Sequence, residues 1–342
     1  MFHKVVVPLE GSELAQDVLP HVAEVVKGRG SQVYLLLAAS LAKGVSPPVV
    51  DALPPVAALQ CKGKRSGSLQ EERQRTERER MAYLQTVARR LESEADDVHI
   101  SVCSGRAADE ILAFVDEVGA DLIAMSKSGR PGISRWVFGS VADRVLRDAP
   151  CPLLLVPTDP RRKTSSDASN ETRPVETPGR RRIAYRHIVV PLDGSELAEQ
   201  VLPCVEALIR PHQTRVFLIR VLTPGLGDRA MALLTSFPPG LQLATSVLHR
   251  AEVQVRGYLR SVAAALRERG AVVQIAVRQG SPAEEILAYA AEVEADVVGM
   301  TTHGLSGVSR WVYGSVAGKV LQEAQSPVLL VRPTFEQGGN GA

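Results

Sequence analysis

The residues best suited to chemistry lie in a short segment near the end of the chain that combines glycine, histidine and hydroxyl side chains. Thr301-Thr302-His303-Gly304 is followed by nine residues and then by Gly314-Ser315. Glycine lets backbone N–H groups approach an anion closely, and a helix beginning at Ser315 would present free N–H groups to a phosphate. The spacing equally allows a simple turn followed by a helix cap, without any ligand.

A related segment occurs in the first half of the chain. Ser126-Lys127-Ser128-Gly129 is followed by nine residues and then by Gly139-Ser140. Ser140 and Ser315 could each add a hydroxyl group to the same backbone arrangement. The sequence therefore predicts two candidate phosphate loops, of which the first has Ser128 in the place of His303.

An acidic residue followed by glycine and serine forms the second candidate constellation. Asp193-Gly194-Ser195 follows one apolar run, and Glu10-Gly11-Ser12 follows another. A carboxylate at the end of a strand can accept hydrogen bonds from a ribose hydroxyl or an adenine amine. The alternative is a helix N-cap, in which the serine caps the helix and the neighbouring acid favours the helix dipole.

These correspondences belong to a repeat that spans most of the chain. Val6-Val7-Pro8-Leu9-Glu10-Gly11-Ser12 recurs as Val189-Val190-Pro191-Leu192-Asp193-Gly194-Ser195, and the segment 132–142 recurs as 307–317. A repeat of this length indicates a duplicated domain rather than a solenoid unit. The segment 158–182 between the copies is polar and has no apolar periodicity, which predicts a mobile linker.

The elements that must position these residues alternate between strand and helix in each copy. In the first copy the predicted strands are Val5–Leu9, Gln32–Ala39, Val98–Ser104, Ala120–Ser126 and Cys151–Val156, and the predicted helices are Glu13–Lys27, Leu69–Ala95, Ala107–Val118 and Ser140–Asp148. The residues 40–68 are expected to be irregular. Such alternation predicts a parallel α/β sheet with helices on both faces and with its ligand site at the carboxyl ends of the strands.

Composition excludes several classes of protein. Hydrophobic residues make up 45% of the 342 residues and the formal net charge is +2, so each copy can bury a core and nothing attracts the chain strongly to nucleic acid. The four cysteines have no zinc-site spacing, and we expect no metal site. There is no apolar run long enough to cross a membrane and no signal peptide, which predicts a cytoplasmic protein.

The two motifs and the closing run Ser326-Pro327-Val328-Leu329-Leu330-Val331 resemble the universal stress protein family, here as two tandem domains. The resemblance implies Rossmann-like, adenine nucleotide alpha hydrolase-like domains. Each would contain a five-stranded parallel sheet with strand order 3-2-1-4-5. The expected boundaries are residues 1–157 and 183–333 for the domains, 158–182 for the flexible linker and 334–342 for a tail.

The resemblance also implies an ATP or AMP site in each copy. In the second copy the implied site residues are Asp193, Val221, Thr301, His303, Gly304, Gly307, Gly314 and Ser315; in the first copy they are Glu10, Ala38, Gly129, Gly132, Gly139 and Ser140. Nucleotide-binding members of the family have glycine where this chain has Thr301 and Ser126, so both copies depart from the family pattern. Glu10 is a further departure, and we expect the second copy to bind ATP more tightly.

The expected function is that of a stress-response regulator that binds ATP, AMP or ADP, with Mg²⁺ accompanying ATP. Little or no catalysis is expected, since the sequence has no GxxxxGK[ST] loop, no GxSxG elbow and no HExxH motif. Two alternatives stay open. One is a protein-interaction module of the same fold that binds no nucleotide, and the other is an adenylating enzyme, for which the sequence offers no substrate domain.

The fifth predicted strands, Cys151–Val156 and Ser326–Val331, would be apolar sheet edges. In the family this edge forms a dimer contact, so the resemblance implies that the two copies pair within one chain. A linker of about 25 residues spans roughly 25–30 Å as a flexible coil, which permits this pairing. The sequence leaves open a further homodimer.

Overall fold

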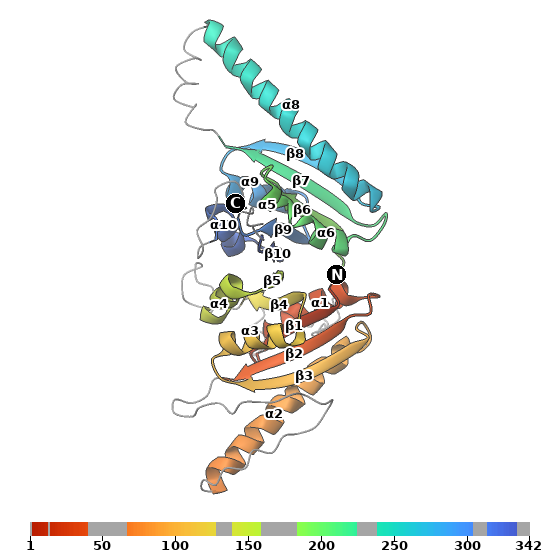
Figure 1. Cartoon of the computed structure of the whole chain (residues 1–342), viewed down its shortest axis with the longest axis vertical. Coiled ribbons are helices and arrows are strands. Elements are labelled where there is room, and N and C mark those ends of the chain that lie inside the picture. The colour runs from red at the N-terminus through yellow and green to blue at the C-terminus, as the bar shows by residue number, and fades with distance from the viewer. Residues whose placement is uncertain are drawn as a thin grey trace, which may run out of the picture.

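The computed structural model describes residues 2–12, 14–39, 67–127, 139–158, 183–223, 238–303 and 313–333. The molecule is elongated, with the two copies following one another along the long axis (Figure 1). The predicted irregular segment 40–68 and the predicted linker lie almost wholly outside the described residues.

The first copy alternates strands and helices as predicted. Its strands are β1 (Lys4–Leu9), β2 (Gln32–Ala39), β3 (Asp97–Ser104), β4 (Leu122–Lys127) and β5 (Leu153–Pro157). Its helices are the 3₁₀ helix η1 (Leu14–Val18), α1 (Leu19–Val26), α2 (Gly67–Leu91), α3 (Ala107–Val118) and α4 (Ser140–Asp148).

The second copy repeats this order. Its strands are β6 (His187–Pro191), β7 (Arg215–Leu222), β8 (Val272–Gln279), β9 (Val297–Thr301) and β10 (Val328–Val331). Its helices are α5 (Glu196–Glu199), α6 (Leu202–Leu208), α8 (Pro238–Glu268), α9 (Pro282–Glu292) and α10 (Ser315–Glu323).

The strands of both copies form one sheet of ten, in the order β3-β2-β1-β4-β5-β10-β9-β6-β7-β8. Within each copy the order is 3-2-1-4-5 and the neighbouring strands are parallel, which confirms the predicted fold class. The copies meet where β5 runs antiparallel to β10, with Leu154 opposite Leu329 (Figure 1). The central strands are buried on both faces, because helices pack on each side.

Two apolar cores lie on opposite faces of this sheet. Successive residues of a strand point to opposite faces, so Val5 and Val7 belong to one core while Val6 belongs to the other. The first core receives side chains from α1, α2, α6 and α8, and the second receives them from α3, α4, α9 and α10. Both cores contain residues of both copies, so the sheet is the common layer of the whole structure.

One predicted helix is corrected by the structure. The sequence predicted a single helix over Glu13–Lys27, but the chain forms η1 and then α1. Pro20 lies in the first turn of α1, where the missing N–H of proline is tolerated. Proline could not lie in the interior of a single helix that continued from η1, because it has no N–H to donate. The second copy is divided in the same way, since Pro203 lies in the first turn of α6, after α5.

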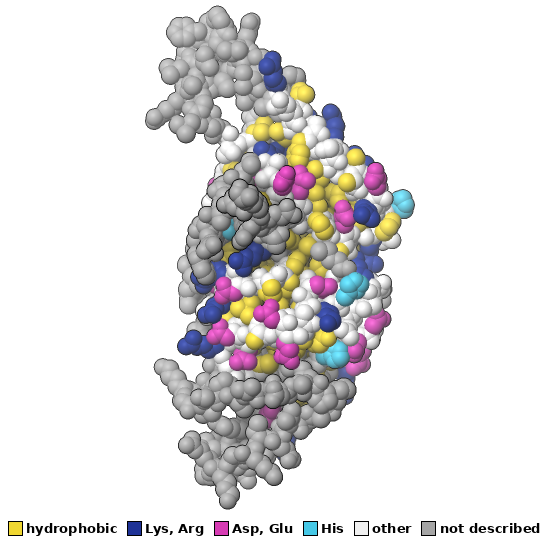
Figure 2. All heavy atoms as spheres, viewed as in Figure 1, with side chains coloured by type: hydrophobic (Ala, Val, Ile, Leu, Met, Phe, Trp, Pro, Cys, Tyr) yellow, Lys and Arg dark blue, Asp and Glu magenta, His cyan; other side chains and the backbone are white. Residues whose placement is uncertain are grey.

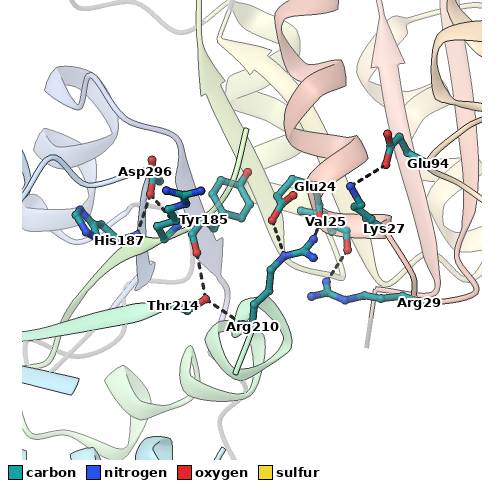
Figure 3. A network of polar contacts seen from close by, with 11 residues as sticks. Glu24, Val25, Lys27, Arg29, Glu94, Tyr185, His187, Arg210, Thr214 and Asp296 are labelled. Carbon is teal, nitrogen blue, oxygen red and sulfur yellow. Dashed lines mark hydrogen bonds and ion pairs between the residues drawn. The ribbon is translucent and has the colours of Figure 1, made fainter. Parts of the chain in front are cut away.

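Polar contacts near the start of the strands also join the two copies. The guanidinium of Arg210 in the second copy donates from Nε to Glu24 Oε1 of α1 at 2.7 Å (Figure 3). His21 Nδ1 lies 3.0 Å from the hydroxyl of Tyr185, which is buried. Burial lowers the pKa of Arg29, and the positive charge of Arg210 lowers it further. These contacts fix α1 against the second copy.

The visible surface carries both signs of charge close together, with Lys and Arg interspersed among Asp and Glu (Figure 2). Among the described residues, no helix has the length and apolar character needed to cross a bilayer.

Two glycines give a direct test of the local backbone. A Cβ would meet nothing within 4 Å at either Gly318 in α10 or Gly119 after α3, but Gly119 has φ +62°. We expect Gly318→Ala to raise the free energy of unfolding by about 0.5–1 kcal/mol, because alanine loses less entropy in a helix. Gly119→Ala is the matched control and should lower it by about 1–2 kcal/mol, since a left-handed backbone is strained for alanine. Urea denaturation of both variants tests this, and equal effects would contradict it.

Candidate functional site

The predicted site residues of the second copy lie at the carboxyl ends of three adjacent parallel strands. Asp193 follows β6, Val221 is near the end of β7 and Thr301 ends β9. Pro191 is paired with Ile219 and Val189 with Val298. Continuing both registers places Asp193 level with Val221 and with Thr302. The strand order reverses direction beside β6, so this is the switch point at which α/β sheets bind ligands.

The first copy brings its counterparts together in the same manner. Leu9 is paired with Leu37 and Val6 with Ile123. The continued register places Glu10 level with Ala38 on β2 and with Lys127 at the end of β4. The sheet therefore juxtaposes each acidic residue with the start of its own candidate phosphate loop.

Both acidic residues hold a serine that caps a helix. Asp193 Oδ1 accepts hydrogen bonds from Ser195 N at 3.0 Å and from Ser195 Oγ at 2.6 Å, and Ser195 Oγ accepts one from Ala198 N at 3.1 Å. In the first copy, Ser12 Oγ donates to Glu10 Oε1 at 3.0 Å and accepts from Ala15 N at 3.2 Å. The cap interpretation is thus confirmed for both serines. It engages Asp193 Oδ1 and fixes the carboxylate at the strand end.

The surroundings of the glycine after each acidic residue differ between the two copies. Gly194 and Gly11 have φ of +79° and +84°, the left-handed region that glycine adopts most easily. A Cβ on Gly194 would lie 2.6 Å from Arg220 Nη1, whereas one on Gly11 would lie 4.0 Å from Leu37 Cδ1. A guanidinium therefore covers this turn in the second copy and an apolar side chain covers it in the first.

Arg220 was missed by the sequence reasoning. It lies on β7 next to Val221, and the repeat aligns it with Leu37, which is buried in the first copy. The available signal was an arginine that interrupts the apolar run after Arg215, at a position where the other copy has leucine. Arg220 adds a positive charge beside Gly194, the residue after Asp193.

The start and the end of the second candidate phosphate loop are tied together. Gly314 N donates to Thr302 O at 3.0 Å, and Thr302 N donates to Val331 O at 3.0 Å. Thr301 Oγ1 donates to His303 O at 2.7 Å, and both threonines are buried. Thr302 Oγ1 lies 3.0 Å from His303 Nδ1. The predicted site residues Gly129, Gly132, Gly304 and Gly307 lie outside the described residues.

The glycine that precedes α10 leaves little room for a side chain. Gly314 has φ −54° and Gly139 has φ −55°, values that any residue adopts. A Cβ on Gly314 would lie 3.3 Å from Thr302 O, which is a tight contact with backbone. α10 begins at Ser315 without a side-chain cap, and Ser315 and Ser140 are exposed. The first N–H groups of such a helix lack intrahelical partners and can bind an anion.

A hollow of about 340 Å³ lies beside this site, between α5, α6 and α8. Glu199, Tyr258 and Ala265 are among its lining residues, and none of the predicted site residues lines it. In the first copy Arg90 has the position of Ala265, and its guanidinium donates to Gln16 Oε1 at 2.6 Å. Burial raises the pKa of Tyr258, and Glu199 raises it further. The two copies thus differ beside this helix, with alanine at the hollow in the second copy and an arginine bonded to Gln16 at the aligned position of the first.

Comparisons with known proteins give a single family. The sequence profile of the universal stress protein family matches residues 1–157 and 184–332. Universal stress protein MJ0531 of Methanocaldococcus jannaschii is 28% identical over 156 residues, which cover 46% of this chain and 82% of that protein. Universal stress protein Rv2005c of Mycobacterium tuberculosis is 27% identical over 215 residues, 62% of each chain.

A solved structure extends the likeness to both copies. The crystal structure of a universal stress protein from Archaeoglobus fulgidus covers 96% of this chain and is itself covered to 96%, with a TM-score of 0.60 and 18% sequence identity. At that identity the likeness concerns the fold alone. The family profile carries the assignment, because it matches each copy of the repeat separately and almost completely. The chain therefore belongs to the universal stress protein family.

Proposed function

We propose that the second copy binds an adenine nucleotide, ATP or AMP, and that the protein acts as a cytoplasmic stress-response regulator. The observation that carries this proposal is the alignment of Asp193, Val221 and Thr302 at one level of three parallel strands. The amino end of α10 is joined to the same point, because Gly314 N donates to Thr302 O at 3.0 Å. An apolar residue, an acidic residue and a helix amino end suited to phosphate are thus adjacent.

The residues present fit the parts of such a nucleotide. Val221 is partly buried against apolar neighbours and offers a surface for adenine, while the Asp193 carboxylate can accept hydrogen bonds from ribose hydroxyls. The uncapped N–H groups at the start of α10 and the guanidinium of Arg220 favour phosphate. Gly304 and Gly307 would complete the loop, and Mg²⁺ would arrive with the phosphates of ATP.

We propose that any hydrolysis of the nucleotide is slow. The sequence has no Walker-type loop, and fast phosphoryl transfer requires a positioned base, metal ligands and a cation at the transferred group. The protein would then act through the presence or absence of bound nucleotide, which a partner protein would recognise. The alternative is an interaction module that binds no nucleotide. A direct measurement of nucleotide binding distinguishes it from this proposal.

The first copy is proposed to bind nucleotide more weakly. Leu37 lies against Gly11, where the second copy has Arg220 beside Gly194, so one positive charge is missing. Its Lys127 is level with Glu10 but donates to Leu321 O and Gln322 O of the second copy. The first difference removes a positive charge that would attract phosphate. The second directs a lysine toward α10 and away from the first site.

We further propose that residues 1–157 and 183–333 act as two domains paired within one chain, joined by a flexible linker. The antiparallel pairing of Leu153–Leu155 with Val328–Leu330 supports this, as does the ion pair between Arg210 and Glu24. Association of two such chains into a homodimer remains compatible with the arrangement.

Replacing Arg220 by methionine is expected to weaken ATP binding about tenfold. A hydrogen bond to a charged group contributes about 1.5–3 kcal/mol, and a tenfold change in affinity corresponds to about 1.4 kcal/mol. Calorimetric titration of the full chain with ATP and with AMP measures this loss.

The matched control is Leu37→Met at the equivalent position of the first copy, which should leave the main affinity unchanged. An Arg220→Met protein that is folded and binds ATP like the original chain would remove Arg220 from the site. A full chain that binds no adenine nucleotide, and that releases none when denatured after purification, would overturn the proposed function itself.

A further inference from the structure

A lysine of the first copy is anchored on the helix that begins at the candidate phosphate loop of the second copy. Lys127 is the last residue of β4 and directly follows Ser126, the start of the first loop. Its ammonium donates to Leu321 O at 2.7 Å and to Gln322 O at 2.5 Å, in the last turn of α10. The carbonyls at a helix carboxyl end have no intrahelical partners and carry partial negative charge, so they favour a cation.

A second contact runs in the opposite direction. Tyr313, which directly precedes Gly314, donates from its hydroxyl to Asp143 O at 3.1 Å. Asp143 lies in the first turn of α4, the helix that begins at Ser140 of the first loop. Burial raises the pKa of Tyr313, so the hydroxyl keeps the proton that this hydrogen bond requires. Each loop thus has a neighbouring side chain bound to the helix of the other loop.

The two copies place their capping cations at different positions. Arg332 Nη1 of the second copy donates to Arg147 O in α4 at 2.9 Å, and the repeat aligns Arg147 with Gln322, the acceptor of Lys127. However, Arg332 follows β10 and lies outside either loop, whereas Lys127 lies within the first loop segment. The residue aligned with Lys127 is Thr302, which stays in its own copy beside His303 Nδ1. Among the described residues, the first copy thus connects the start of its loop to the opposite helix by a cation, and the aligned residue of the second copy does not.

We propose that Lys127 is a positioning residue for the second nucleotide site and that it couples the two candidate sites energetically. This inference rests on the proposed function. α10 has only nine residues, about 13 Å of rigid helix, so a shift at Leu321 and Gln322 is transmitted to Gly314 and Ser315. A ligand that displaces the end of β4 would move Lys127, and with it the amino end of α10. Burial lowers the pKa of Lys127, consistent with an ammonium enclosed between the copies.

The test compares three variants of the full chain by calorimetric titration with ATP. Lys127→Met is expected to weaken binding at the second site by about fivefold or more, the lower range of measured couplings between sites. Lys127→Arg keeps a cation and should restore affinity to within twofold of the original chain. Arg332→Met is the matched control, since it removes the equivalent cap from α4 and leaves α10 untouched. Its ATP affinity should stay within twofold.

Two results would overturn the proposal. One is unchanged ATP affinity in Lys127→Met. The other is an equal loss in Lys127→Met and Arg332→Met, which would indicate general loosening between the copies.

A chain that binds no nucleotide would refute the proposed function but would still test the coupling. Hydrogen exchange of the backbone amides 318–321, the first that donate hydrogen bonds within α10, is then the measurement. Lys127→Met should speed this exchange about tenfold relative to Arg332→Met, because an uncapped short helix opens more often. Equal exchange in the two variants would reject the positioning role.

Discussion

Replacing Gly314 by valine is expected to lower the ATP affinity of the protein about 10- to 100-fold while leaving the chain folded. Even a Cβ at this position would lie 3.3 Å from Thr302 O, so a branched side chain must push the amino end of α10 away from β9. That movement would cost one or two charge-assisted hydrogen bonds to phosphate, each worth about 1.5–3 kcal/mol. The backbone itself is no obstacle, because φ is −54°.

The matched control for Gly314→Val is Gly139→Val, which has the same position and backbone in the first copy. Calorimetric titration with ATP should show a small change for Gly139→Val, because the first copy is the proposed weaker site. Thermal denaturation of both variants checks that they remain folded. Full ATP affinity in a folded Gly314→Val protein would remove this helix start from the phosphate site, and a larger loss in Gly139→Val would assign the main site to the first copy.

A cysteine pair at Leu154 and Leu329 is expected to form a disulfide within one chain. The two residues are direct partners of the antiparallel β5–β10 ladder and their side chains share one core. Opposite Cα atoms in such a ladder are about 4.5–5.5 Å apart, within the range that a disulfide bridges. Closing a loop of this size should raise the free energy of unfolding by up to about 5 kcal/mol.

Non-reducing electrophoresis and urea denaturation of the oxidised double variant measure the crosslink and its effect. The single variants Leu154→Cys and Leu329→Cys are the controls, since Cys103, Cys151 and Cys204 are already present as free thiols. A fast-migrating monomer in the double variant alone is the expected result. A disulfide-linked dimer would mean that β5 and β10 pair between chains, and the absence of any crosslink would mean that they are not opposite one another.

Much of the fold follows from local sequence. The apolar runs that become β1 and β6 are buried on both faces, as central strands of a parallel sheet are. The repeated motifs show which residues of the two copies correspond to one another. Strand order could be predicted through the family resemblance. The division of the predicted helix into η1 and α1 had a visible signal in Pro20, because proline cannot donate the hydrogen bond that a continuing helix needs.

The candidate site was predictable only in part. The acid–glycine–serine motifs and the Gly-Ser pairs before α4 and α10 identify positions along the chain, and their meeting at the strand ends follows from parallel strand order. Arg220 escaped prediction because its place beside Gly194 depends on how β7 pairs with β6, across 25 intervening residues of the chain. Periodicity reports which face a residue takes, but not which distant backbone it will meet.

The polar side-chain contacts between the copies were decided by tertiary structure alone. Nothing near Lys127 in the sequence indicates that its ammonium binds the carbonyls of α10, nearly two hundred residues away, or that Arg210 pairs with Glu24. Such partners are set by the antiparallel joining of β5 and β10, which brings the ends of α4 and α10 within reach of the opposite copy. A sequence determines which segments bury their apolar faces, whereas the direction of a long charged side chain depends on the partners that the assembled sheet provides.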